Sequence, residues 1–171
     1  MHLNHSTFHN YSSKHSFIGR REMDIFSQKT PIKLLAYDHV GIRVSNKQKA
    51  LSFYQSLGFI ETASFPDYEA NEMMSEHGVR INLIFNGSSH LKSQNVLHDS
   101  PVKLPGITHP AFIVDDIGKL KNWLNTNSIH ITEGPKAIGP RRIALFIRDP
   151  DGNVLEFNQL VSESNNGVEI S

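Results

Sequence analysis

Two histidines and one glutamate have residue types and spacing that suit metal binding. His39 lies in AYDHVGIRV (residues 36–44), and His109 lies 70 residues later at the same point of a related segment, ITHPAFIV (residues 107–114). Glu156 follows in the segment VLEF. Imidazole nitrogen and carboxylate oxygen are common ligands of divalent metal ions. The chain has no cysteine, which excludes thiolate zinc sites, iron–sulfur clusters, disulfides and cysteine nucleophiles.

The alternation of polar and apolar residues over 36–44 predicts a strand with one buried face. His39 belongs to the polar set, so it points away from the apolar side chains. The residues that follow have helical spacing. This helix is expected to be capped by Ser45 or Asn46 and to end at Gly58.

Three short strands after this helix complete a unit of the order βαβββ, and turn residues separate them. They are expected over residues 59–65, 68–75 and 79–86. The same order then repeats, with a strand over 107–114, a helix opening at Asp115 or Asp116, and strands over 129–133, 142–148 and 153–160. Such a duplication predicts one α+β domain built from two equivalent modules.

The sequence RDPDGN (residues 148–153) predicts the hairpin turn that presents Glu156. Pro150 presets φ for a turn, and Gly152 accepts positive φ without steric penalty. In the next strand, the neighbours of Glu156 are apolar, so the glutamate points to the opposite face. The acidic residues of this turn suggest a calcium loop, but the segment is too short and lacks a distal glutamate ligand.

These motifs together resemble the vicinal oxygen chelate superfamily of glyoxalase, bleomycin-resistance and extradiol dioxygenase proteins. The resemblance covers about residues 36–160 and rests on DHVGIRV with ALSFYQSLGF, on ITHPAFIVDD and on RDPDGNVLEF. It implies a curved eight-stranded mixed sheet around a site, with metal held from the first and fourth strands of each module. The positions that match are His39, Asn82, His109 and Glu156.

Asn82 departs from the glyoxalase I pattern, in which a carboxylate at this place is both ligand and proton shuttle. An amide has no usable basicity and binds metal weakly, so glyoxalase I chemistry is not expected. The remaining two histidines and one carboxylate resemble the ligand set of non-haem Fe(II) oxygenases and of fosfomycin-resistance thiol transferases. Such a set leaves Fe, Mn, Ni or Zn with room for two adjacent substrate oxygens.

The leading hypothesis is a metal-dependent enzyme, glyoxalase-like or dioxygenase-like, that acts on a small molecule through vicinal oxygens. Oxygenation, lyase and transferase chemistry stay open. A thiol transferase should carry a basic cluster beside the site, and none is apparent near Glu156. The alternative from another class is a metal-free protein that sequesters a small molecule, as the bleomycin-resistance branch does. Four side chains could supply an acid or base near the metal, and the sequence does not choose among them: Tyr54, Tyr68, His77 and His130.

Several other residues are interpreted as structural. Phe53, Tyr54 and Trp123 have the spacing of a helix core. The segment EGPKAIGPRR (residues 133–142) is interpreted as a solvated loop, and the alternative is a lid whose Lys136, Arg141 and Arg142 meet an anionic substrate. His77, at a turn, and His90 and His98, in a polar linker, are left out of the site.

Composition supports a single domain with a small-molecule partner. The chain has 171 residues, 38% of them hydrophobic, and 17 basic residues balance 17 acidic ones, so neither nucleic acid nor an anionic membrane is an expected partner. No apolar run reaches the ~18 residues of a spanning helix, and we expect a cytoplasmic protein. An open strand edge makes a homodimer the expected assembly.

The predicted organisation has three parts. They are a disordered polar extension (1–33), the domain (34–160, with module one 36–86, linker 87–106 and module two 107–160) and a flexible tail (161–171). Four histidines of the extension, His2, His5, His9 and His15, are not expected to form a metal site because a mobile segment cannot preorganise ligands. Translation from Met23 is an alternative start.

Overall fold

The computed structural model describes residues 34–89 and 94–161, so the predicted extension 1–33, with its histidines and Met23, lies outside the described residues. His90 and most of the predicted tail also lie outside them. The chain divides between Tyr37 and Asp38 into two compact units. All of the described helices and strands belong to the second unit.

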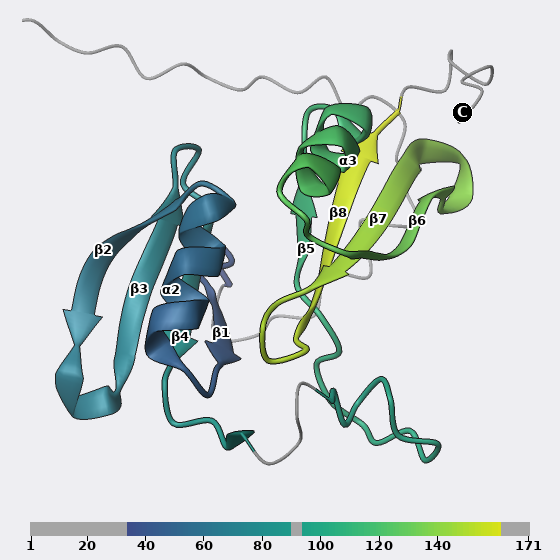
Figure 1. Ribbon diagram of the computed structural model, residues 1–171. Helices are drawn as coiled ribbons and strands as arrows, with labels where there is room; N and C mark the ends of the chain where they lie inside the picture. The colour runs from purple at the N-terminus through teal and green to yellow at the C-terminus, as the bar shows by residue number, and fades with distance from the viewer. Residues whose placement is uncertain (1–33, 90–93, 162–171) are drawn as a thin grey trace, which may run out of the picture. The chain divides into compact units, whose positions relative to one another are not determined.

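Two βαβββ modules follow each other in the chain, as predicted (Figure 1). Module one contains β1 Val40–Arg43, α2 Lys47–Ser56, β2 Phe59–Phe65, β3 Ala70–Ser75 and β4 Arg80–Ile84. Module two contains β5 Ala111–Ile113, α3 Ile117–Thr126, β6 Ile131–Ala137, β7 Arg142–Arg148 and β8 Val154–Leu160. Single 3-10 turns, η2 Pro66–Tyr68 and η4 Gly139–Arg141, precede β3 and β7.

Within the described residues, the eight strands form two four-stranded mixed sheets, with the orders β1-β4-β3-β2 and β5-β8-β7-β6. The first strand of each module pairs in parallel with the fourth, and the other pairs are antiparallel. A parallel pair needs a long crossover connection, which the helix and the two intervening strands supply. The α+β class and the duplicated modules are therefore confirmed, with the expected curved sheet present as two separate halves.

The helix caps lie where the sequence places them. The side chain of Asn46 accepts a hydrogen bond from the backbone N–H of Lys49 at 2.9 Å, and Asp116 does the same for Lys119 at 2.9 Å. Gly58 follows α2 with φ of 90°, a conformation that disfavours other residues. The N-cap is therefore Asn46 and not Ser45, because the Asn46 side chain binds the N–H of Lys49, whereas the Ser45 hydroxyl binds Asp151.

Several strand boundaries differ from the predictions, and those of β1, β5 and β6 bear on the site. β1 and β5 are shorter than expected, so both candidate histidines lie just before their strands. Before β5, Pro110 has no N–H to donate to a sheet. β6 continues to Ala137, so the predicted loop over 133–142 is mostly strand and the single turn η4. A register irregularity at Glu133–Lys136 accommodates Pro135 in this edge strand.

Most of the buried apolar side chains of both modules belong to one hydrophobic cluster, and Ala144, Phe146 and Val154 form a second, smaller one. Tyr54 and Leu124 bring the inner faces of α2 and α3 into the larger cluster, while Phe53 and Trp123 pack against it partly buried. The assignment of these aromatic residues to the core is confirmed. Burial of an amphipathic face, rather than intrinsic propensity, is what holds such short helices in place.

The turn between β7 and β8 ties the two modules together through a buried carboxylate. Asp149 accepts hydrogen bonds from the backbone N–H groups of Asp151 at 2.9 Å and Asn153 at 2.8 Å, and from the Tyr54 hydroxyl at 3.0 Å. The backbone N–H and the hydroxyl of Ser45, next to α2, bind the Asp151 carboxylate. These bonds account for the carboxylates of the turn without a calcium ion.

Burial disfavours the charged form of both side chains of the Tyr54–Asp149 pair. Burial, followed by the charge of Asp149, raises the pKa of Tyr54 well above its ordinary value, so the hydroxyl stays a donor. Burial also raises the pKa of the Asp149 carboxyl, although the hydrogen bonds from Asn153 and Tyr54 oppose that shift. The carboxylate is therefore tolerated because its oxygens are fully hydrogen-bonded.

The described residues contain no helix that is long and apolar enough to cross a membrane.

Replacing Tyr54 with phenylalanine should lower the free energy of unfolding by about 1–2 kcal/mol at neutral pH, because a buried acceptor loses a donor. Since Asp149 has a raised pKa, acidification protonates it and the loss should shrink as pH falls through the aspartate range. Urea denaturation at pH 7 and pH 4 measures both effects. Tyr68→Phe, at a side chain that is 76% exposed, is the control, and equal losses in the two variants would contradict this account.

Candidate functional site

His109 and Glu156 form the centre of the candidate site. His109 lies two residues before β5, and Glu156 lies within β8, opposite Ala111 of β5. The Nε2 atom of His109 is 2.8 Å from Oε2 of Glu156. The backbone N–H of Glu156 also donates to the carbonyl of Pro110 at 3.1 Å. Parallel pairing of β5 and β8 thus brings together two of the predicted ligands.

Glu156 is a buried carboxylate, only 8% exposed. Its neighbours Leu155 and Phe157 lie in the hydrophobic core, as the alternation predicted. Phe146, opposite Glu156 on β7, places its ring edge to face with His109, with 5.7 Å between ring centroids. Among the residues that the structure describes, His109 is the one side chain that hydrogen-bonds to this carboxylate. A buried negative charge with so little compensation favours a cation nearby.

Each candidate histidine is held at Nδ1 by the residue immediately before it. Thr108 Oγ1 lies 3.0 Å from Nδ1 of His109, and Asp38 Oδ2 lies 2.6 Å from Nδ1 of His39. A hydrogen bond at Nδ1 fixes the orientation of the ring and leaves Nε2 as the atom for a ligand bond. The two modules therefore prepare their histidines in the same way.

His39 has contacts separate from those of the His109–Glu156 pair. Its partner Asp38 also accepts a hydrogen bond from Arg80 Nη1 at 2.6 Å. The hydrogen bond from His39, helped by the Arg80 charge, lowers the pKa of Asp38. In the part of the chain that the structure describes, no three His, Asp or Glu side chains lie where they could hold one ion. The chain by itself thus assembles two of the three predicted ligands.

The strand register supports the equivalence of Asn82 and Glu156. Asn82 of β4 is opposite Gly41, two residues after His39, just as Glu156 is opposite Ala111, two residues after His109. The Oδ1 atom of Asn82 is buried and has no hydrogen-bond partner among the described residues. Module one consequently offers an amide where module two offers a carboxylate.

The pair at the centre of the site fits a divalent metal ion in its donor chemistry. One imidazole nitrogen and one carboxylate oxygen already lie side by side, and an ion bound by both would neutralise the buried charge of Glu156. Nitrogen and oxygen donors of this kind suit Fe, Mn, Ni or Zn. Within the described residues, what the pair lacks is a third donor.

His98, left out on the basis of sequence, lies beside this pair. Its ring contacts that of His109, with 5.9 Å between centroids and 49° between planes. Its Nε2 atom is buried and has no hydrogen-bond partner in the described part of the chain. No local pattern could have indicated this contact, because His98 belongs to the linker and meets the site only through the fold.

The linker turn that carries His98 is fastened to the hairpin that carries Glu156. The Asn95 side chain accepts hydrogen bonds from the backbone N–H groups of Leu97 at 3.0 Å and His98 at 3.2 Å. Asp99 pairs with Arg148, at the end of β7, through two bonds of 2.8 and 2.6 Å. These bonds from Arg148, more than any other contact, lower the pKa of Asp99 to about 2. The ion pair therefore persists at any ordinary pH.

The segment considered as a lid contributes one basic side chain to the surroundings of the site. Lys136 of β6 lies over the Phe146 ring, 5.8 Å from its centroid, and pairs with Glu133. Phe146 also contacts His109. The Lys136 amine is therefore separated from the His109–Glu156 pair by the Phe146 ring. It is held by a strand rather than by a mobile loop.

The four candidate acids and bases named from sequence do not gather at this pair. Tyr54 is buried and donates to Asp149. Tyr68, in η2, is exposed, as are His77 and His130. Among the described residues, none of them has a hydrogen bond or ring contact with His109 or Glu156.

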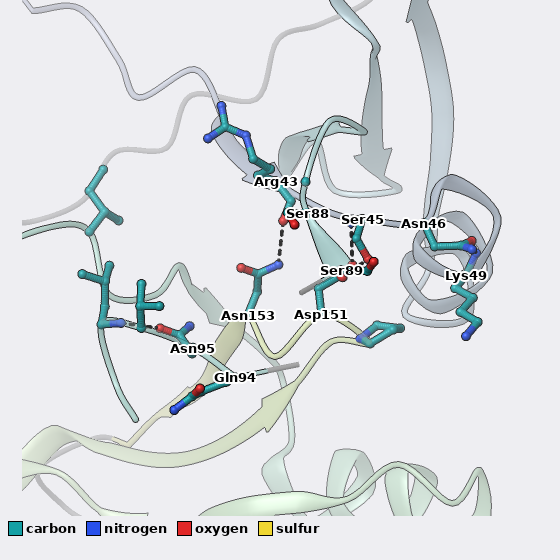
Figure 2. A pocket seen from close by; sticks show the side chains of 15 residues that line it. Arg43, Ser45, Asn46, Lys49, Ser88, Ser89, Gln94, Asn95, Asp151 and Asn153 are labelled. Atoms are coloured by element: carbon teal, nitrogen blue, oxygen red, sulfur yellow. Dashed lines mark hydrogen bonds between the residues drawn. The ribbon is translucent and has the colours of Figure 1, made fainter. Parts of the chain in front are cut away.

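A separate pocket of about 910 Å³ lies beside the start of α2 and the β7–β8 turn. Figure 2 shows Asn153 donating to the backbone carbonyl of Arg43, and Asp151 beside Ser45, along one wall. Asn95 lines it from the linker. Of the described residues that line this pocket, none is a predicted ligand, so its polar walls are distinct from the His109–Glu156 pair.

Comparison with known families gives one match that covers most of the chain. The Glyoxalase/Bleomycin resistance protein/Dioxygenase superfamily matches residues 36–157. No curated protein matches the chain.

Solved structures with the same fold come from several bacteria. A glyoxalase family protein from Bacillus cereus is 16% identical, with 78% of this chain and 99% of that chain covered and a TM-score of 0.58. A glyoxalase/dioxygenase from Nostoc punctiforme is 17% identical, with 78% and 100% covered and a TM-score of 0.57. An antibiotic binding protein from a Streptomyces species is 21% identical, with 76% and 99% covered and a TM-score of 0.57.

His109→Ala should lower the free energy of unfolding of the metal-free protein by about 1–3 kcal/mol, because it leaves the buried Glu156 carboxylate without a partner. Urea denaturation in the presence of a chelator measures this change. His39→Ala is the matched control: its partner is exposed, so a loss below about 0.5 kcal/mol is expected. If the two variants lose the same stability, the electrostatic role given to His109 is wrong.

Proposed function

The chain belongs to the Glyoxalase/Bleomycin resistance protein/Dioxygenase superfamily, and on this basis we propose that it is a metal-dependent enzyme acting on a small molecule with two adjacent oxygens. The observation that supports this proposal best is that both histidines are oriented in the same way, by a hydrogen bond at Nδ1. Each Nδ1 is bound by the preceding side chain, which keeps Nε2 for a metal. We also propose a cytoplasmic location, with neither nucleic acid nor membrane as a partner.

In this proposal His109, Glu156 and one His39 hold Fe, Mn, Ni or Zn. A divalent ion in such a set polarises the substrate oxygens and stabilises negative charge on them. Thr108 fixes the orientation of the His109 ring, and Phe146 forms an apolar wall against that ring. Lys136, above that wall, favours substrates with negative charge.

The reaction is proposed to be of the oxygenase or lyase type without glyoxalase I proton transfer. Asn82, at the position equivalent to Glu156, cannot take up a proton. A base for such chemistry would have to come from the substrate or from another side chain. The amide leaves the ion with one negative ligand, so the net positive charge on the site is larger than with two carboxylates.

We further propose a homodimer in which His39 comes from the partner copy. Within the described part of one chain, His39 does not join the His109–Glu156 pair. β1 and β5, the strands next to the two histidines, are both edge strands of their sheets, and open edges favour association with another chain. A two-fold arrangement would give two equivalent sites for each dimer.

A second candidate function is metal-free binding of a small molecule. It is supported by the lack of a three-donor group in the described residues and by the likeness to an antibiotic binding protein. In that case Phe146 and the exposed face of β5 would contact the ligand, and His109 would serve only as the partner of Glu156.

Metal binding should distinguish the two functions. In the full chain without an affinity tag, Ni²⁺ or Zn²⁺ at 100 times Kd should raise the Tm by about 5–10 °C, because the ion binds only the folded state. Glu156→Ala and His109→Ala should lose this rise and the bound metal, measured by elemental analysis. His77→Ala is the control. All variants keep the same N-terminal histidines, so any metal bound there is common to all of them. No rise in the unsubstituted chain would favour the metal-free function.

Mixed dimers test whether the site is shared between copies. Neither His39→Ala nor Glu156→Ala alone should bind metal, but co-expression of the two should restore about one quarter of the sites, because half the dimers keep one intact site. Metal content of the co-expressed population measures this recovery, and in the isolated mixed dimer it should rise to about one half of the sites. Sites built within one chain would show none, which would contradict the shared arrangement and leave the metal function itself intact.

A further inference from the structure

We propose that His98 contacts the substrate, its Nε2 forming a hydrogen bond with an oxygen of the ligand bound at His109 and Glu156. This inference rests on the proposed function and extends it, because the superfamily match does not assign a role to the linker. It begins from the position of the His98 ring against His109, 5.9 Å between centroids.

The unpartnered nitrogen of His98 is the first argument. Nε2 is buried and without a hydrogen-bond partner in the described residues, and such an atom in a protein interior is unfavourable. Its neighbour His109 is already satisfied on both sides, by Thr108 and Glu156. An oxygen-rich ligand arriving beside His109 would give this nitrogen the partner that the protein does not.

The second argument is the rigidity of the turn. The Asn95 side chain accepts hydrogen bonds from the backbone N–H groups of Leu97 and His98 within the turn. Its Nδ2 also donates to the carbonyl of Gly152 at 3.2 Å. Asp99 and Arg148 form a two-bond ion pair, which is a geometrically specific contact. Both attachments lead to the β7–β8 hairpin, whose second strand carries Glu156. His98 is thus held relative to the ligand position and does not depend on a chance loop conformation.

A direct metal bond from His98 is a different assignment, and the geometry does not favour it. His98, His109 and Glu156 do not form a group that could hold an ion, as judged over the described residues. We therefore assign His98 to the ligand rather than to the metal. The exposed Lys136 lies over Phe146, which in turn contacts His109.

The experiment measures metal binding and ligand binding separately. The full chain is loaded with Co²⁺ or Ni²⁺, and the probe is 4-nitrocatechol, which has two adjacent oxygens and absorbs in the visible when chelated. His98→Ala and the similarly sized His98→Leu should raise the probe Kd by about tenfold, as expected for one lost hydrogen bond to a charged oxygen. Metal affinity should change by less than about threefold, a difference too small to reflect a lost ligand bond.

Two further variants give the result its meaning. His98→Gln, which keeps a hydrogen-bonding group in the side chain, should recover most of the probe affinity. His77→Ala, at an exposed turn, should bind metal and probe as the unsubstituted chain does. Recovery by glutamine would not occur if His98 served only to pack against His109.

Three outcomes would overturn the inference, and each points to a different cause. Unchanged probe affinity in His98→Ala and His98→Leu would remove His98 from the site and leave the metal function standing. Loss of metal in these variants, as in His109→Ala, would make His98 a metal ligand. If the unsubstituted chain binds neither metal nor probe, the proposed function fails and the role of His98 fails with it.

Discussion

The parallel pairing of the first and fourth strands of each module is the constraint on which the site depends. This pairing sets Glu156 opposite Ala111 and Asn82 opposite Gly41. In module two, the histidine two residues before Ala111 then lies beside the fourth-strand carboxylate. A shift of one residue would turn Glu156 into the core and bring an apolar neighbour to His109. Apolar residues on both sides of Glu156 prevent that shift.

The β7–β8 turn connects this register to the rest of the domain. Its buried carboxylate, Asp149, binds Tyr54 of α2, and Asp151 binds Ser45. Arg148, at the start of the same turn, holds Asp99 of the linker. A single hairpin thus fixes the strand that carries Glu156, the first helix of the other module, and the linker turn beside the site. Fully hydrogen-bonded buried groups of this kind specify one arrangement more strongly than apolar contacts do.

The two modules have equivalent strand registers but differ in charge at the fourth strand. Both present a histidine fixed at Nδ1 by the residue before it. Only module two follows with a carboxylate on the fourth strand, and Asn82 in module one has an unpartnered oxygen among the described residues. The asparagine side chain is one methylene shorter than glutamate, but the strand register is the same at the two positions. The chemistry differs, because only the carboxylate can carry charge or a proton.

The sequence by itself determined the two modules, their order and the turn before Glu156, and it narrowed each helix cap to two neighbouring residues, because these features depend on local periodicity and turn chemistry. It also indicated the equivalence of Asn82 and Glu156, since a repeat aligns with itself. Only the tertiary structure decided that Glu156 contacts His109 at 2.8 Å, that β6 runs past Glu133, and that His98 lies against His109. Those facts depend on strand register and on the path of a linker, and neither is encoded within a few neighbouring residues.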